Sequence, residues 1–87
     1  MPTVWIPPLL QHLTDGQRIL TVPGETILEL ISELEKDYPG IQDRLCEDGR
    51  LRPGISITVD SVVSNIGLRH RLSEMSEVHF LPAISGG

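Results

Sequence analysis

The sequence predicts an α+β roll, in which one long helix packs on one face of a mixed sheet of four to five strands. Three observations lead to this fold class. An apolar stripe with helical spacing runs from Ile27 to Tyr38, a strict alternation of apolar and polar residues spans 55–59, and a second alternation spans 77–81. With two short runs near the N-terminus and one at 62–63, the expected order is strand, strand, helix, strand, short strand, strand.

The first two strands are expected to form a hairpin. Val4, Trp5 and Ile6 are strand formers, but Pro7 and Pro8 follow at once, so the strand must end there or lie at a sheet edge. The run 14–16 (Thr-Asp-Gly) is a turn signal, and apolar residues resume over 17–22. We therefore expect a strand on each side of a turn.

The helix has a clear start, face and end. Thr26 and Glu29 have the spacing of a capping box. The apolar stripe that follows consists of Ile27, Leu30, Ile31, Leu34 and Tyr38. We expect it to face the sheet as part of the core, with Tyr38 closing the end of that core. Pro39 and Gly40 stop the helix, and 41–45 could add one further turn.

The second half of the chain supplies the remaining strands. The run 55–59 is expected to be a central strand, and Asp60-Ser61 to turn the chain into a short strand at 62–63. The segment 47–50 reads as loop, as does most of 64–76, which should be held by Leu68, Leu72 and Met75. The strand 77–81 completes the sheet, which should stop at Pro82 because proline has no ladder donor.

Composition excludes several classes of function. A chain of 87 residues has room for one domain, and its net charge of −5 argues against nucleic acid, whose phosphates need clustered cations. No apolar run is long enough to span a bilayer, and the start lacks the pattern of a signal peptide, so we expect a cytoplasmic protein. Cys46 is the sole cysteine and the three histidines lack ligand spacing, so we expect no bound metal.

The last six residues carry the chemistry that we expect. Residues 1–81 should form the folded domain and 82–87 a flexible tail, which at about 3.3 to 3.6 Å per residue reaches roughly 20 Å. Gly86 and Gly87 would pass through a narrow channel, and the Gly87 carboxylate, anionic at neutral pH, could attack an ATP phosphorus to give an acyl adenylate. The residues expected to thread into a partner are Pro82, Ala83, Ile84, Ser85 and Gly86.

Several stretches match a known family. They are Val4-Trp5-Ile6-Pro7, Thr14-Asp15-Gly16-Gln17, Gly24-Glu25-Thr26, Leu34-Glu35 through Tyr38 to Gly40-Ile41, Arg44-Leu45, Gly67-Leu68, and Leu81-Pro82-Ala83 before Gly86-Gly87. With the order of elements, they make the chain resemble the MoaD/ThiS family of sulfur carriers, whose fold is the ubiquitin-like β-grasp. The resemblance is greatest to the longer CysO-type carriers and spans nearly the whole chain.

The resemblance implies a carrier without catalysis of its own. An E1-like adenylating protein would activate Gly87 with ATP, and the resulting thiocarboxylate would give its sulfur to an accepting enzyme. That enzyme would be cysteine synthase-like, for cysteine biosynthesis, or the large subunit of molybdopterin synthase, with this chain as the small subunit. The sequence agrees with a non-enzyme that binds no cofactor, because it has no nucleotide-binding glycine loop and no nucleophile beside a base.

Two other functions remain open at this point. A ubiquitin-like modifier would begin with the same adenylate but be joined through Gly87 to lysine side chains. A β-grasp binding module with an inert tail would leave the terminal Gly86-Gly87 without a role. The nucleophile that follows the adenylate, sulfur or an amine, decides between the first two.

A partner-binding surface is expected beside the root of the tail. If Val4 and Ile6 face the helix, Trp5 lies on the outer face of the sheet, and the same alternation places His79 and Leu81 there. An exposed tryptophan beside an aliphatic residue is typical of protein interfaces. The alternative is that the 50–52 loop or the hairpin itself covers Trp5.

Overall fold

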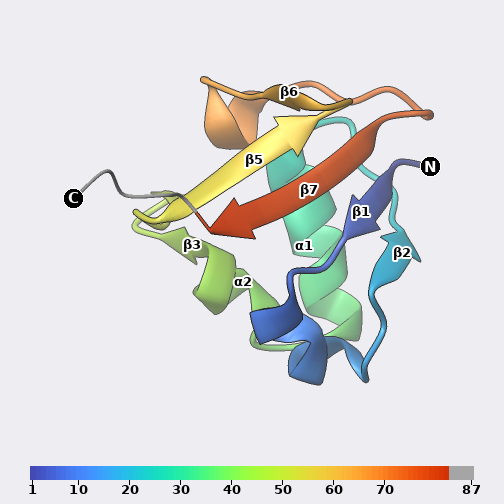
Figure 1. The fold of residues 1–87 in the computed structure, drawn as a ribbon, viewed down its shortest axis with the longest axis vertical. Coiled ribbons are helices and arrows are strands. Elements are labelled where there is room, and N and C mark those ends of the chain that lie inside the picture. The colour runs from blue at the N-terminus through green and yellow to red at the C-terminus, as the bar shows by residue number, and fades with distance from the viewer. Residues whose placement is uncertain (83–87) are drawn as a thin grey trace.

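The computed structural model, which describes residues 1–82, confirms the predicted α+β roll (Figure 1). Its five-stranded mixed sheet has the order β2-β1-β7-β5-β6, and helix α1 packs across one face. The sheet strands are β1 (Thr3–Trp5), β2 (Ile19–Thr21), β5 (Ile55–Val59), β6 (Val62–Val63) and β7 (Glu77–Pro82). The helical segments are α1 (Ile27–Asp37), α2 (Ile41–Leu45) and the 3₁₀ helices η1 (Pro8–Thr14) and η2 (Gly67–Arg69).

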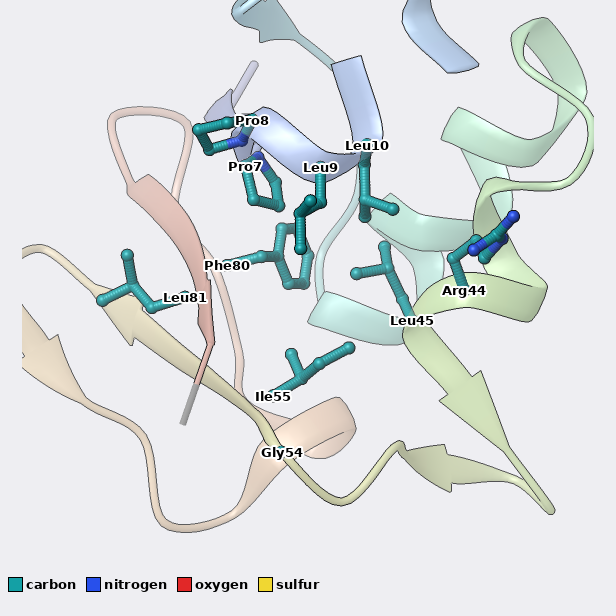
Figure 2. A pocket seen from close by; sticks show the side chains of 10 residues that line it. All are labelled: Pro7, Pro8, Leu9, Leu10, Arg44, Leu45, Gly54, Ile55, Phe80 and Leu81. Atoms are coloured by element: carbon teal, nitrogen blue, oxygen red, sulfur yellow. The ribbon is translucent and has the colours of Figure 1, made fainter. Parts of the chain in front are cut away.

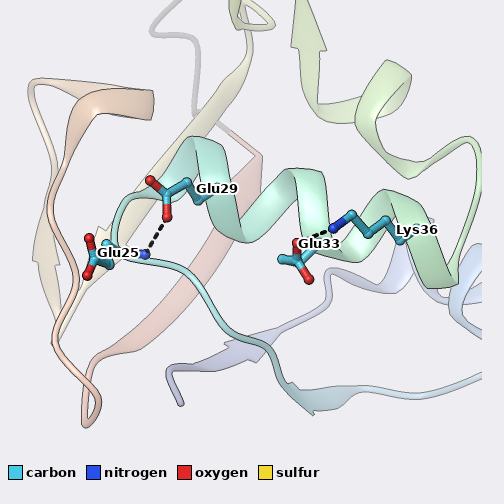
Figure 3. A network of polar contacts seen from close by, with 4 residues as sticks. All are labelled: Glu25, Glu29, Glu33 and Lys36. Atoms are coloured by element: carbon cyan, nitrogen blue, oxygen red, sulfur yellow. Dashed lines mark hydrogen bonds and ion pairs between the residues drawn. The ribbon is translucent and has the colours of Figure 1, made fainter.

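Helix α1 begins at the predicted cap. The Glu29 N–H donates to Thr26 Oγ1 at 3.2 Å. Glu29 Oε1 accepts from the N–H of Glu25 at 3.1 Å, one residue earlier than a standard capping box requires, and Figure 3 shows this second bond. The same figure shows the Lys36 Nζ to Glu33 Oε2 ion pair, 2.7 Å long and on the solvent side. Polar contacts thus fix the helix start and line its outer surface.

The predicted helical stripe forms the centre of the core. Ile27, Leu30, Ile31 and Leu34 are buried, and Tyr38 packs half-buried at its end, as the sequence predicted. The strands contribute Val4, Ile57, Val59, Val78 and Phe80, and Ile6 and Val22 directly follow β1 and β2. The shorter helices η1, α2 and η2 contribute Leu10, Ile41, Leu45 and Leu68. Each Å² of apolar surface that this cluster removes from water stabilises the fold by about 25 cal/mol.

The N-terminal hairpin exists, but its connection is helical. β1 and β2 pair antiparallel, with Trp5 opposite Ile19, and η1 lies in the segment that connects them. The sequence reading missed η1, although Pro8 at its first turn suits a helical start. The Thr14 side chain at its end is fully buried, and its Oγ1 lies within 3.2 Å of the Gln11 and Gln17 carbonyl oxygens.

Two expectations for the second half were wrong. The 47–50 loop is a tight hairpin that joins β3 (Cys46–Glu47) to β4 (Arg50–Leu51), because Asp48 and Gly49 take the positive φ angles, 53° and 77°, of a type I′ turn. Met75 does not hold the 64–76 segment, since it is 85% exposed. Instead Leu68 is buried, and Leu72 packs against the core.

The last strand lies at the centre of the sheet. β7 pairs parallel with β1 and antiparallel with β5, so β5 is an interior strand while β7 is the middle one. The strand includes Pro82, opposite Ile55, and so runs one residue further than the sequence predicted. Within residues 1–82, no helix is long and apolar enough to cross a membrane.

Candidate functional site

The strand β7, which leads into the predicted tail, is paired along both of its edges. Val78 and Phe80 of β7 are buried, and the strand has a paired neighbour on each edge. Pro82 is the last described residue, so Gly87 and the threading residues Ala83, Ile84, Ser85 and Gly86 lie outside the described part of the chain. Their predicted roles, and the division at 81/82, stay predictions.

The structure brings the three predicted patch residues to the outer face of the sheet. Val4, Ile6, Val78 and Phe80 point into the core, which leaves Trp5, His79 and Leu81 on the opposite face. Leu81 is 44% exposed, and Trp5 and His79 are half-buried. The two rings stack, with centroids 4.4 Å apart and planes 16° from parallel.

This stack belongs to a row that crosses the whole sheet. Trp5 lies opposite Ile19 on β2 and His79 on β7, His79 lies opposite Thr58 on β5, and Thr58 lies opposite Val63 on β6. Ile19 and Val63, at the two ends, are exposed. The sequence reading missed them because only the strand register, which alternation does not fix, places Ile19 beside Trp5 and Val63 beside Thr58.

The other reactive side chains have structural surroundings. Burial raises the pKa of the Cys46 thiol, an effect that Arg52 opposes more weakly, so the thiolate is disfavoured. Ser64 Oγ lies 2.8 Å from His70 Nδ1 and accepts from the N–H groups of Ile66 and Gly67, which makes it a loop brace. In the described range 1–82, no group of three or more His, Cys, Asp or Glu residues is placed to hold a metal ion.

A hollow opens beside the tail root. Figure 2 shows this cavity of about 480 Å³, bounded by η1, α2 and the adjoining ends of β5 and β7. Its lining is mostly apolar and consists of Pro7, Pro8, Leu9, Leu10, Arg44, Leu45, Gly54, Ile55, Phe80 and Leu81. Sequence reasoning missed it, because η1 forms one wall and was not predicted.

Comparison with known proteins places the chain in a family. The model of the ThiS family matches residues 6–87. The chain is 36% identical to the sulfur carrier protein CysO of Mycobacterium tuberculosis, over 98% of this chain and 97% of that protein. It is also 30% identical to the small archaeal modifier protein 3 of Haloferax volcanii, over 71% of this chain and 70% of that protein.

Solved structures agree with the sequence matches. A chain of the Amycolatopsis orientalis BexX/CysO complex superposes with a TM-score of 0.91 at 30% identity, over the full length of both chains. The crystal structure of M. tuberculosis CysO gives 0.90 at 32% identity, over 97% of this chain and all of that one. The fold is thus the ubiquitin-like β-grasp. The chain belongs to the ThiS family, among relatives named as carriers and modifiers rather than enzymes.

Proposed function

We propose that this chain is a sulfur carrier of cysteine biosynthesis. An E1-like protein uses ATP to adenylate the Gly87 carboxylate, a sulfur donor replaces AMP to leave a thiocarboxylate, and an accepting enzyme of the cysteine synthase type takes the sulfur. The observation that carries the proposal is the 36% identity to CysO over almost the whole of both chains. The chain itself serves as co-substrate, with catalysis supplied by its partners.

The architecture supports this division of labour. β7 is paired on both edges and holds Phe80 in the core, so the domain keeps a fixed position while a partner works on the residues that follow. Holding the reacting carboxylate against ATP then becomes a matter of reach and orientation, which are strong contributors to rate. The thiol of Cys46 is not needed, because the sulfur travels on the Gly87 carbonyl carbon.

The test is reconstitution followed by intact-mass spectrometry. The full chain is incubated with the E1-like protein of its own organism, ATP and a sulfide source, and it should gain the mass difference of one sulfur for one oxygen, located at Gly87. A chain lacking Gly87, and one extended by a single residue, should keep the same thermal stability but form no adenylate. Normal activation of the extended chain would show that the site is misplaced.

A second function, protein modification through Gly87, is favoured by the similarity to the small archaeal modifier protein 3. Both functions share the adenylate and differ at the next nucleophile, so the same reaction mixture distinguishes them. If the mixture contains a lasting adenylate and isopeptide products on lysines but no thiocarboxylate, the chain is a modifier and the carrier proposal is wrong.

We also propose that Trp5, His79 and Leu81 form the surface on which the adenylating partner docks. Leu81→Asp should leave the fold intact, because this side chain is 44% exposed, and weaken binding to that partner. Loss of an interface anchor costs on the order of 2 kcal/mol, or roughly 30-fold in Kd. Leu28→Asp is the matched control, since Leu28 is 45% exposed and lies on α1, across the sheet from the patch.

Trp5 offers a direct readout because it is the sole tryptophan. Its emission should move to shorter wavelength when the adenylating partner is added, since docking removes water from the indole. Leu28→Asp should show the same shift and Leu81→Asp a reduced one. Equal affinity of the two variants would rule out the sheet face as the docking surface.

A further inference from the structure

The cavity beside the tail root has the chemistry of a site for an apolar side chain. Leu45 and Phe80 form its buried wall, Ile55 is half-buried, and Leu9 stands at the mouth with 81% of its surface exposed (Figure 2). An aliphatic group seated there would cover Leu9 and Ile55, which the described fold leaves in contact with water. The cavity shares Leu81 with the sheet-face patch but lies on the other side of β7, because Phe80 points to the opposite side of the strand from His79.

The position of the cavity selects its occupant. Pro82 pairs with Ile55, and Ile55 and Gly54 both line the cavity, so the chain leaves the sheet at the cavity edge. Five residues follow, enough for roughly 17 Å of extended chain. Among them Ile84 is the one large apolar residue, and an alternation continued from Val78 and Phe80 would turn its side chain to the cavity side.

The charge of the chain also favours the tail as the occupant of the cavity. The chain carries a net charge of −5, so the net field of the protein disfavours a terminal carboxylate near its surface. Arg44 is exposed at the cavity rim and makes no ion pair with any residue in the range 1–82. Gly87 is three residues beyond Ile84, about 10 Å of chain, which brings its carboxylate within reach of that guanidinium.

We propose that the tail docks on its own domain when no partner is bound, with Ile84 in this cavity and the Gly87 carboxylate beside Arg44. This inference rests on the proposed function for its significance, since an activating enzyme must displace the docked tail before it can adenylate Gly87. The affinity that such an enzyme shows is then reduced by the fraction of chains whose tail is free.

The test is methyl NMR on the free, full-length protein. Nuclear Overhauser effects are expected from the Ile84 methyl groups to the Phe80 ring and to the Leu9 and Ile55 methyl groups. Ile84→Ser should remove them and shift the Leu9, Leu45 and Ile55 methyl resonances. Ile66→Ser is the matched control, because Ile66 is an exposed isoleucine outside the cavity lining, and it should leave those resonances in place.

A second variant perturbs the cavity and leaves the tail unchanged. Leu9→Asp adds a carboxylate at the mouth and should abolish the same Overhauser effects, while the exposed position of Leu9 keeps the fold intact. Absence of the effects in the wild-type protein, with unchanged methyl shifts in Ile84→Ser, overturns the proposal. Effects that appear only between differently labelled molecules in a mixed sample overturn it too, because the occupant is then a second copy. No adenylating enzyme is present, so these outcomes are independent of thiocarboxylate formation.

Discussion

Replacing Gly24 with alanine should destabilise the fold more than an ordinary glycine replacement. A Cβ atom at Gly24 would lie 2.7 Å from the backbone nitrogen of Leu30 and 2.9 Å from its Cα, whereas ordinary contact begins near 3.4 Å. Either the β2 to α1 connection or the first turn of α1 must therefore move by about 0.7 Å. Leu30 is fully buried, so the movement disturbs the centre of the core. Overpacking of this kind costs about 1–3 kcal/mol.

Gly49→Ala is the matched control for this clash. Gly49 also has a positive φ, +77° against +158° at Gly24, but a Cβ there meets nothing within 4 Å. Both variants gain alike from a less flexible unfolded chain. An excess cost of about 2 kcal/mol in Gly24→Ala corresponds to a Tm roughly 8–16 °C lower than that of Gly49→Ala, measured by circular dichroism during thermal unfolding. Equal midpoints for the two variants would refute the reasoning.

Three further predictions concern the helix junction, the thiol and the ring stack. The Glu35 carboxylate accepts three backbone contacts of 2.9–3.2 Å where α1 meets α2. Glu35→Ala should therefore lower the free energy of unfolding in urea by about 1–2 kcal/mol. Glu33→Ala, which removes a surface ion pair, should leave that free energy unchanged. Because burial raises the pKa of Cys46, alkylation near pH 8 should be slower than for the unfolded chain and should accelerate only at higher pH; equal rates would contradict this. His79→Ala should raise the acrylamide quenching constant of Trp5, since one indole face loses its cover; an unchanged constant would argue against the stack.

The sequence predicted best where one periodicity dominates. The stripe from Ile27 to Leu34 and the alternation of 55–59 each bury a continuous face, so local pattern and tertiary packing favour the same structure. Prediction failed where the pattern was short. The Asp48-Gly49 hairpin has two-residue strands, and no periodicity can be read from two residues.

The candidate site was also predictable only in part. Alternation was enough to place Trp5, His79 and Leu81 on one face, because it needs only the strand and the direction of the core. The ring stack and the positions of Ile19 and Val63 depend on strand register, and the cavity depends on η1. Both are determined by packing between segments that lie far apart in the chain. For the same reason Met75 could not be distinguished from a core residue, since an isolated apolar residue in a loop carries no periodicity.

The place of β7 in the sheet supports the proposal that this domain offers its C-terminal end to other proteins. An edge strand is held along one side, so a partner that draws on its end can peel the strand away by breaking one ladder. β7 is held by β1 on one side and by β5 on the other, and Val78 and Phe80 fix it to the core. The proposed docking patch also spans β1 and β7, so a partner seated on it would contact both strands of the pair that precedes the tail. A partner can therefore draw on the residues that follow β7 without separating the strand from the sheet or from the core.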